Sequence, residues 1–168
     1  SWVRIEGNRY WRPRVEAGWR PYWHGRWAYT PAGLTWIAYE PWGWVPFHYG
    51  SWNYLDGYGW VWQPGYVWSP AWVYWYWGPS YVGWCPTGFY TGWYGRHFHD
   101  PAFRFGVYGW AGGEWDHFSN WSFVGIGHFG RRDLRHWERT GGDLRGDMRM
   151  KELPRGIITT DTRGLTPG

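Results

Sequence analysis

Two short sequence motifs decide the fold of this chain: WIAYEP at residues 36–41 and GWVWQP at residues 59–64. Each motif closes a unit of the same make-up. The units open with WRPY at 19–22 and WVPF at 44–47, and they continue with GRWAY at 25–29 and GSWNY at 50–54. They are offset by 25 residues at their openings and by 23 at their ends. A looser third unit runs from Trp68 to Pro86, and WRP at 11–13 is typical of the tail of an earlier copy.

Aromatic residues stand at alternate positions inside these units. The alternating pairs are Trp27 with Tyr29, Trp52 with Tyr54, and Trp60 with Trp62. A period of two places both members of a pair on one face of a β-strand. Turn signals at 30–33 (TPAG) and 55–59 (LDGYG) separate the segments, and proline after Trp-x ends a strand because it cannot donate to a ladder. Each unit is therefore predicted to be a two-stranded hairpin.

A lone hairpin is only marginally stable in water, so the hairpins must pair or stack. We therefore expect an all-β fold of tandem Trp/Tyr-rich hairpin repeats that form a twisted sheet or a small barrel. The sequence leaves an open sheet, a barrel and a propeller-like ring of hairpins as alternatives.

The composition agrees with this fold class. Of 168 residues, 21 are Trp, 14 Tyr and 8 Phe, beside 27 Gly and 12 Pro. Gly and Pro interrupt long helices, whereas aromatic residues favour strands. Disordered chains are poor in aromatics, so disorder is excluded as well.

Charge, cysteine content and hydropathy exclude several classes of protein. The net charge is +4, with both signs mixed along the chain, and no dense basic groove indicates nucleic acid binding. Cys85 is the single cysteine and can form no internal disulfide. The most apolar stretch, residues 66–77, is too short to span a bilayer and contains Pro70, so we expect no transmembrane segment.

Near residue 130 the composition changes from rich in aromatic residues to rich in charged residues. We predict an aromatic-rich repeat domain at 1–130 and a charged extension at 131–168. RRDLRHWER at 131–139 is typical of a short helix with Leu134 and Trp137 on one face, and Ile157–Thr160 is typical of a late strand. The arginines of the extension are expected to contact a partner: Arg131, Arg132, Arg135 and Arg139.

One cluster could suggest a metal site. His97, His99 and Asp100 lie close together in the sequence, and alternate histidines on a strand share a face. Their spacing matches no zinc signature, so we interpret them as ordinary loop and surface residues and predict neither a metal nor a cofactor.

The sequence also resembles a known group of proteins. The phrases that carry the resemblance are GWRP at 18–21, YEPWGWVPFHYG at 39–50, GYGWVWQP at 57–64 and VGWCP at 82–86, with Ile157 and Ile158 near the end. They resemble an uncharacterised tryptophan-rich repeat family of bacterial secreted or periplasmic proteins, whose domain often follows a FecR-like domain. The resemblance implies an all-β domain and an extracytoplasmic, periplasmic or secreted location. It implies no chemistry.

Three classes of function remain to be compared. Catalysis is not expected, because Glu40 and Asp56 fall in predicted turns and no nucleophile motif is present. We expect a non-enzymatic scaffold that binds a protein partner, as an accessory subunit of a membrane-associated assembly, because aromatics and arginine dominate interface hot spots. The alternative is a carbohydrate-binding module that stacks cell-wall glycan on a coplanar row of exposed rings. In either case the predicted binding surface comprises Arg26, Trp27, Tyr29, Trp52, Tyr54, Trp60, Trp62 and Trp72.

Overall fold

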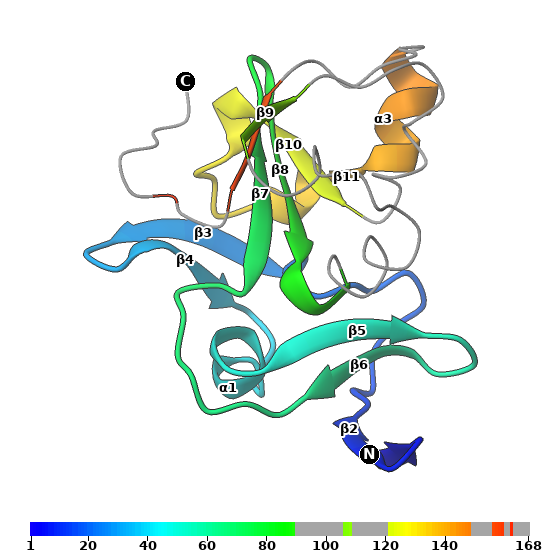
Figure 1. The fold of residues 1–168 in the computed structure, drawn as a ribbon. Helices are drawn as coiled ribbons and strands as arrows, with labels where there is room; N and C mark the ends of the chain where they lie inside the picture. Colours follow the sequence, from blue (N-terminus) through cyan, green and yellow to red (C-terminus); the bar gives the residue numbers. More distant parts are fainter. Residues whose placement is uncertain (90–105, 109–120, 149–155, 160–161, 163–168) are drawn as a thin grey trace.

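The computed structural model describes residues 1–89, 106–108, 121–148, 156–159 and 162. Regular structure in these residues is mostly β-strand, with a few short helices, and the paired strands are antiparallel (Figure 1). The predicted all-β fold is confirmed.

The three predicted repeat units are three hairpins. Their strands are β3 (Gly25–Thr30) with β4 (Gly33–Ala38), β5 (Ser51–Leu55) with β6 (Gly59–Gln63), and β7 (Val73–Trp77) with β8 (Tyr81–Pro86). β4 and β6 end shortly before Pro41 and Pro64, as the proline steps predict. The repeat therefore reports the hairpin boundaries correctly.

The hairpins are distributed over three sheets rather than one. β3 and β4 pair only with each other, while β5 and β6 continue into β2 (Asn8–Trp11) and β1 (Trp2–Ile5) in the order β1-β2-β6-β5. β7 and β8 lie inside a six-stranded sheet of order β11-β10-β8-β7-β12-β9. Its other strands are β9 (Gly106–Tyr108), β10 (Ser122–Gly125), β11 (Arg139–Thr140) and β12 (Gly156–Thr159). Within the described residues each sheet runs from one edge strand to another, so the strands form open sheets and not a closed barrel.

The charged extension supplies a short helix and a late strand, as expected. β12 pairs with β7, and the eight-residue helix α3 spans Gly141–Met148. Within the predicted helix at 131–139 the structure has a single 3-10 turn, η4 (Leu134–His136). Leu134 is fully buried and Trp137 packs against the core, so the two share a face as predicted. A second 3-10 turn, η3 (Ile126–His128), follows β10. The division of the chain into domains at residue 130 stays a prediction.

Each hairpin places two buried tryptophans opposite each other in the core. The opposed pairs are Trp27 and Trp36, Trp52 and Trp62, and Trp75 and Trp84. Burying one aromatic side chain removes roughly 150–250 Å² from water, so these pairs dominate the packing. The ring centroid of Trp27 lies 4.4 Å from that of Trp75 and 5.6 Å from that of Trp84, so the first and third hairpins pack on each other.

Candidate functional site

The short helix α1 (Trp44–His48) is held in place by aromatic side chains from distant segments. Four consecutive backbone carbonyls, those of residues 46–49, accept hydrogen bonds. The donors are Trp52 Nε1 to Pro46 O (2.8 Å), Tyr22 Oη to Phe47 O (2.8 Å), Trp72 Nε1 to His48 O (2.9 Å) and Trp62 Nε1 to Tyr49 O (2.8 Å). A helix leaves its last carbonyls without internal partners, and here indole and phenol groups satisfy them. The position of α1 is therefore fixed by the core.

The outer side of α1 and the loop between β6 and β7 expose large apolar side chains. We call Trp44, Val45, Tyr66, Val67 and Trp68 the aromatic patch. Their exposed fractions range from 40% for Trp68 to 97% for Tyr66. An exposed group of this kind usually marks a site of interaction with another molecule.

His48 joins the two halves of the aromatic patch. Its ring centroid lies 4.5 Å from that of Trp44 and 5.9 Å from that of Trp68, with which it is stacked at 14°. His48 and Ser69 also exchange two hydrogen bonds, because Ser69 N donates to His48 O and His48 Nδ1 lies 2.9 Å from Ser69 O. The loop is thus attached to α1, and Trp44 and Trp68 belong to one surface.

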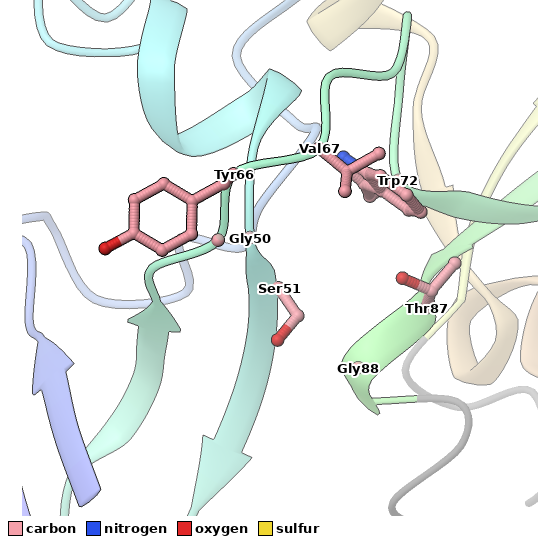
Figure 2. A pocket seen from close by; sticks show the side chains of 8 residues that line it. Gly50, Ser51, Tyr66, Val67, Trp72, Thr87 and Gly88 are labelled. Atoms are coloured by element: carbon pink, nitrogen blue, oxygen red, sulfur yellow. The ribbon is translucent and has the colours of Figure 1, made fainter.

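A pocket of about 350 Å³ borders the aromatic patch (Figure 2). Val67 and Trp72 line it together with the hydroxyl-bearing residues Ser51, on β5, and Thr87, directly after β8, and the side chain of Tyr66 points to the other side of Gly50. Glycines allow the chain segments around it to approach closely. A Cβ on Gly50, where φ is +70°, would lie 2.1 Å from Gln63 O.

This region of the chain is nearly free of charge. Between residues 41 and 95 the sequence contains a single Asp, Glu, Lys or Arg, which is Asp56. Asp56 lies in the turn between β5 and β6, outside the residues that form the aromatic patch and its pocket. The surface therefore offers apolar contacts and neutral hydrogen-bonding groups, and it carries no formal charge.

Ionisable groups in the interior form a separate cluster. Glu138 is 4% exposed, and burial raises its pKa to about 9 against the opposing effect of Arg20 and Arg135. Burial likewise raises the pKa of Glu40 to about 7. In the described part of the chain neither carboxyl group has a hydrogen-bond partner, so both favour the protonated form. Burial also raises the pKa of the Cys85 thiol well above its ordinary value.

The predicted aromatic binding residues divide into buried and exposed ones. Trp27, Trp52 and Trp62 lie in the core and present no ring to solvent. Tyr29 and Tyr54, two positions nearer the hairpin turns, are about half exposed. Trp60, Trp72 and Arg26 are partly buried, and Trp72 lines the pocket beside the aromatic patch. Alternation correctly places such pairs on one face of a strand. That face is covered by the core in the middle of the hairpin and is exposed to solvent near the turn.

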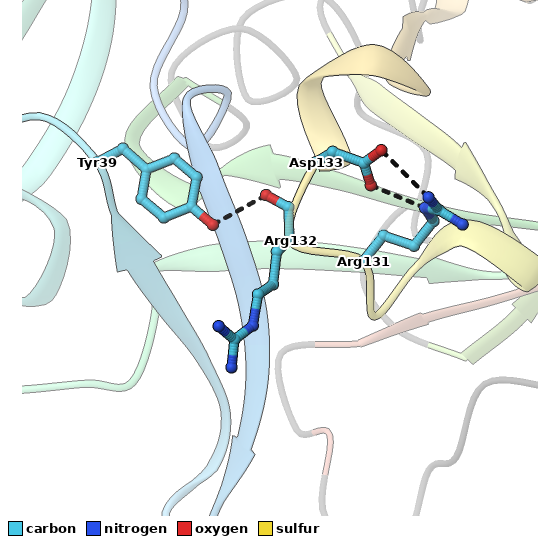
Figure 3. A network of polar contacts seen from close by, with 4 residues as sticks. All are labelled: Tyr39, Arg131, Arg132 and Asp133. Carbon is cyan, nitrogen blue, oxygen red and sulfur yellow. Dashed lines mark hydrogen bonds and ion pairs between the residues drawn. The ribbon is translucent and has the colours of Figure 1, made fainter.

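The four arginines of the extension have different surroundings. Arg131 forms an ion pair with Asp133 (2.7 Å), and Arg135 forms one with Glu16. The backbone oxygen of Arg132 accepts a hydrogen bond from Tyr39 Oη at 2.9 Å, which ties the extension to the end of β4, and its side chain points away from this contact (Figure 3). Arg139 donates to Glu138 O. Within the described residues Arg131 and Arg135 thus pair with carboxylates of the same chain.

The metal candidates His97, His99 and Asp100 lie outside the described residues. Among the residues that are described, no cluster of three or more His, Cys, Asp or Glu side chains could hold a metal ion. No helix in that same part of the chain is long and apolar enough to cross a membrane.

Comparison with known proteins gives one match. Residues 1–92 match the model of a family of unknown function, DUF6600. This stretch contains the first, second and third hairpins and the aromatic patch. Neither the curated proteins nor the solved structures contain a match.

Proposed function

The chain belongs to DUF6600, a family of unknown function, and we propose that it is a non-enzymatic scaffold module that docks a protein partner through the aromatic patch. The observation that carries the proposal is the exposure of Trp44 and Trp68, which are joined through His48, together with the exposure of Tyr66 in the same loop as Trp68. Tryptophan and tyrosine are enriched among the few residues that supply most of the binding energy at protein interfaces. The core of such an interface is also depleted in charged residues, as this surface is.

The rigidity of the support favours the same proposal. Ordering side chains and loops on binding costs free energy, so a surface that is already fixed binds more tightly than a mobile one. Here the carbonyls of residues 46–49 are held by four aromatic donors, and the loop is held by His48 and Ser69. The backbone that carries the patch is therefore held in place before a partner arrives.

The partner surface expected from this chemistry is apolar and uncharged. A charged partner would lose hydration on contact with Val45, Val67 and the tryptophans without gaining an ion pair. We further propose that the module acts outside the cytoplasm as an accessory component of a membrane-associated assembly. This location rests on the sequence resemblance.

Co-purification with matched variants tests the proposed docking. The full chain carries an affinity tag, is recovered from gently solubilised membranes of the producing cells, and is compared with a Trp44→Ser/Tyr66→Ser variant and a Tyr29→Ser control. Tyr29 is about half exposed and lies outside the patch. Each hot-spot aromatic contributes about 2 kcal/mol or more, so the double variant is expected to bind roughly 1,000-fold more weakly.

The expected result is one protein in fixed ratio with the wild type and the Tyr29→Ser control, and its loss with the double variant. Unfolding curves establish that all three chains are folded. Equal recovery by the double variant would contradict docking through the patch, and a partner-free wild type would contradict the scaffold function itself.

A further inference from the structure

A second pocket lies at the opposite end of the second hairpin. It has a volume of about 450 Å³, within the roughly 300–1,000 Å³ that ligand pockets occupy. One wall is the segment between β2 and β3, and the other is the turn between β5 and β6. The two walls contribute four aromatic residues: Trp19, Tyr54, Tyr58 and Trp60.

Two glycines shape the walls of this pocket. Gly18 and Gly59 have φ values of +82° and +76°, the left-handed conformation that glycine adopts without strain. A Cβ atom on either residue would meet nothing within 4 Å. Open space therefore lies in front of both turns, and the pocket is accessible.

The aromatic residues form an angled cleft rather than the flat row of rings expected for a glycan platform. Tyr54 stands opposite Trp60 in the strand pairing, and their rings lie 5.5 Å apart at 81°. Tyr54 is 50% exposed and Tyr58 is 36% exposed. Rings at right angles can contact the apolar C–H face of a sugar from two directions, since the negative π face attracts C–H groups.

The charge of the pocket favours an anion. Arg12 is exposed and lines it, and its lining carboxylate, Glu16, is paired with Arg135. Arg20 also borders it, but its guanidinium is buried and donates to Trp121 O at 3.0 Å, so Arg12 is the cation that a ligand can reach. Guanidinium groups bind carboxylates with two parallel hydrogen bonds.

We infer that this pocket binds an acidic oligosaccharide, one whose sugar rings carry carboxylate groups. Tyr54 and Tyr58 stack against the C–H faces of the rings, and Arg12 pairs with a carboxylate. The inference goes beyond the proposed docking of a protein partner, because it assigns a different ligand to a different part of the surface.

Isothermal titration of the full chain tests this inference. The ligands are trigalacturonate, the uncharged trisaccharide maltotriose, and citrate, which carries carboxylates without a sugar ring. Trigalacturonate is expected to bind at least about tenfold more tightly than either of the others. Its affinity is expected to fall as salt is raised, because part of the attraction is between exposed charges.

Matched variants locate the site. Arg12→Gln and Tyr58→Ala are each expected to weaken trigalacturonate binding by at least about fivefold, and Trp44→Ser in the aromatic patch is expected to leave it unchanged. Binding of maltotriose or citrate as tight as that of trigalacturonate would overturn the assignment. So would an absence of trigalacturonate binding at about 5 mM, or unchanged affinity in both pocket variants. These outcomes do not bear on partner docking, which depends on Trp44 and Tyr66.

Discussion

Replacing Tyr22 by phenylalanine is expected to destabilise the fold strongly although it removes a single oxygen atom. Tyr22 is fully buried, its hydroxyl donates to Phe47 O at 2.8 Å, and it accepts a hydrogen bond from Trp72 N at 3.1 Å. The Tyr22→Phe variant keeps the ring but leaves a carbonyl and an N–H in the interior without their partner. Each such group costs about 1–3 kcal/mol, so the loss in the free energy of unfolding is about 2–6 kcal/mol.

The assay is urea unfolding followed by tryptophan fluorescence, with Tyr66→Phe as the matched control. Tyr66 is 97% exposed, so the same chemical change there is expected to alter stability by less than about 0.5 kcal/mol. A loss of about 2–6 kcal/mol would be a large part of the roughly 5–15 kcal/mol free energy of unfolding that domains possess. Equal unfolding curves for the two variants would refute the reasoning that Tyr22 holds α1.

Three further predictions concern the interior. The pKa of Glu138 is about 9 in the folded chain against an ordinary 4.5, so between these pH values the folded chain binds one proton more than the unfolded chain. The free energy of unfolding is therefore expected to fall by up to about 1.4 kcal/mol per pH unit as pH rises through this window, and Glu138→Gln is expected to remove this slope. Parallel curves of stability against pH for the wild type and the variant would contradict the prediction. A Cβ at Gly83 would lie 2.5 Å from the ring of Phe123, so Gly83→Ala is expected to lower the stability measured by thermal unfolding by about 1–3 kcal/mol. A Cβ at Gly127 would meet open space, so Gly127→Ala is expected to change stability by less than about 0.5 kcal/mol. Equal melting temperatures of the two variants would be inconsistent with this packing. Cys85 is fully buried, so Ellman's reagent is expected to modify it only after unfolding in urea, and rapid labelling of the native protein would show that the thiol is exposed.

The hairpins could be predicted from the sequence because their signals are local. Alternation of aromatics, proline at strand ends and glycine-rich turns all act within a few residues. The burial of individual rings could not be predicted in this way. Trp27 and Tyr29 lie on one strand face, yet one is buried and the other half exposed, because burial depends on which other sheet the strand meets.

The helix α1 shows why equivalent phrases need not fold alike. WRPY at 19–22 and WVPF at 44–47 hold the same place in the repeat, but the first forms a turn with Tyr22 at φ +56° and the second is helical. The difference arises from tertiary contacts: the carbonyls of 46–49 are satisfied by Trp52, Trp62, Trp72 and Tyr22. No local pattern reports such contacts.

The aromatic patch lies where strand periodicity gives no signal. Trp44 and Val45 are on α1, and Tyr66, Val67 and Trp68 are in a loop, so none of them lies on a strand. The signal that could have indicated this region is the run from residue 41 to 95 with one charged side chain. Such a run needs either burial or a partner to cover it.

Site-specific photo-crosslinking tests the docking surface most directly. A benzoylphenylalanine is placed at position 66 in the aromatic patch or at position 58 in the turn between β5 and β6, and each chain is irradiated in the producing cells. We predict one crosslinked protein, identified by mass spectrometry, from position 66 but not from position 58, and its loss when Trp44→Ser is added. No crosslinked protein at position 66, or the same product from both positions, would contradict docking through the aromatic patch.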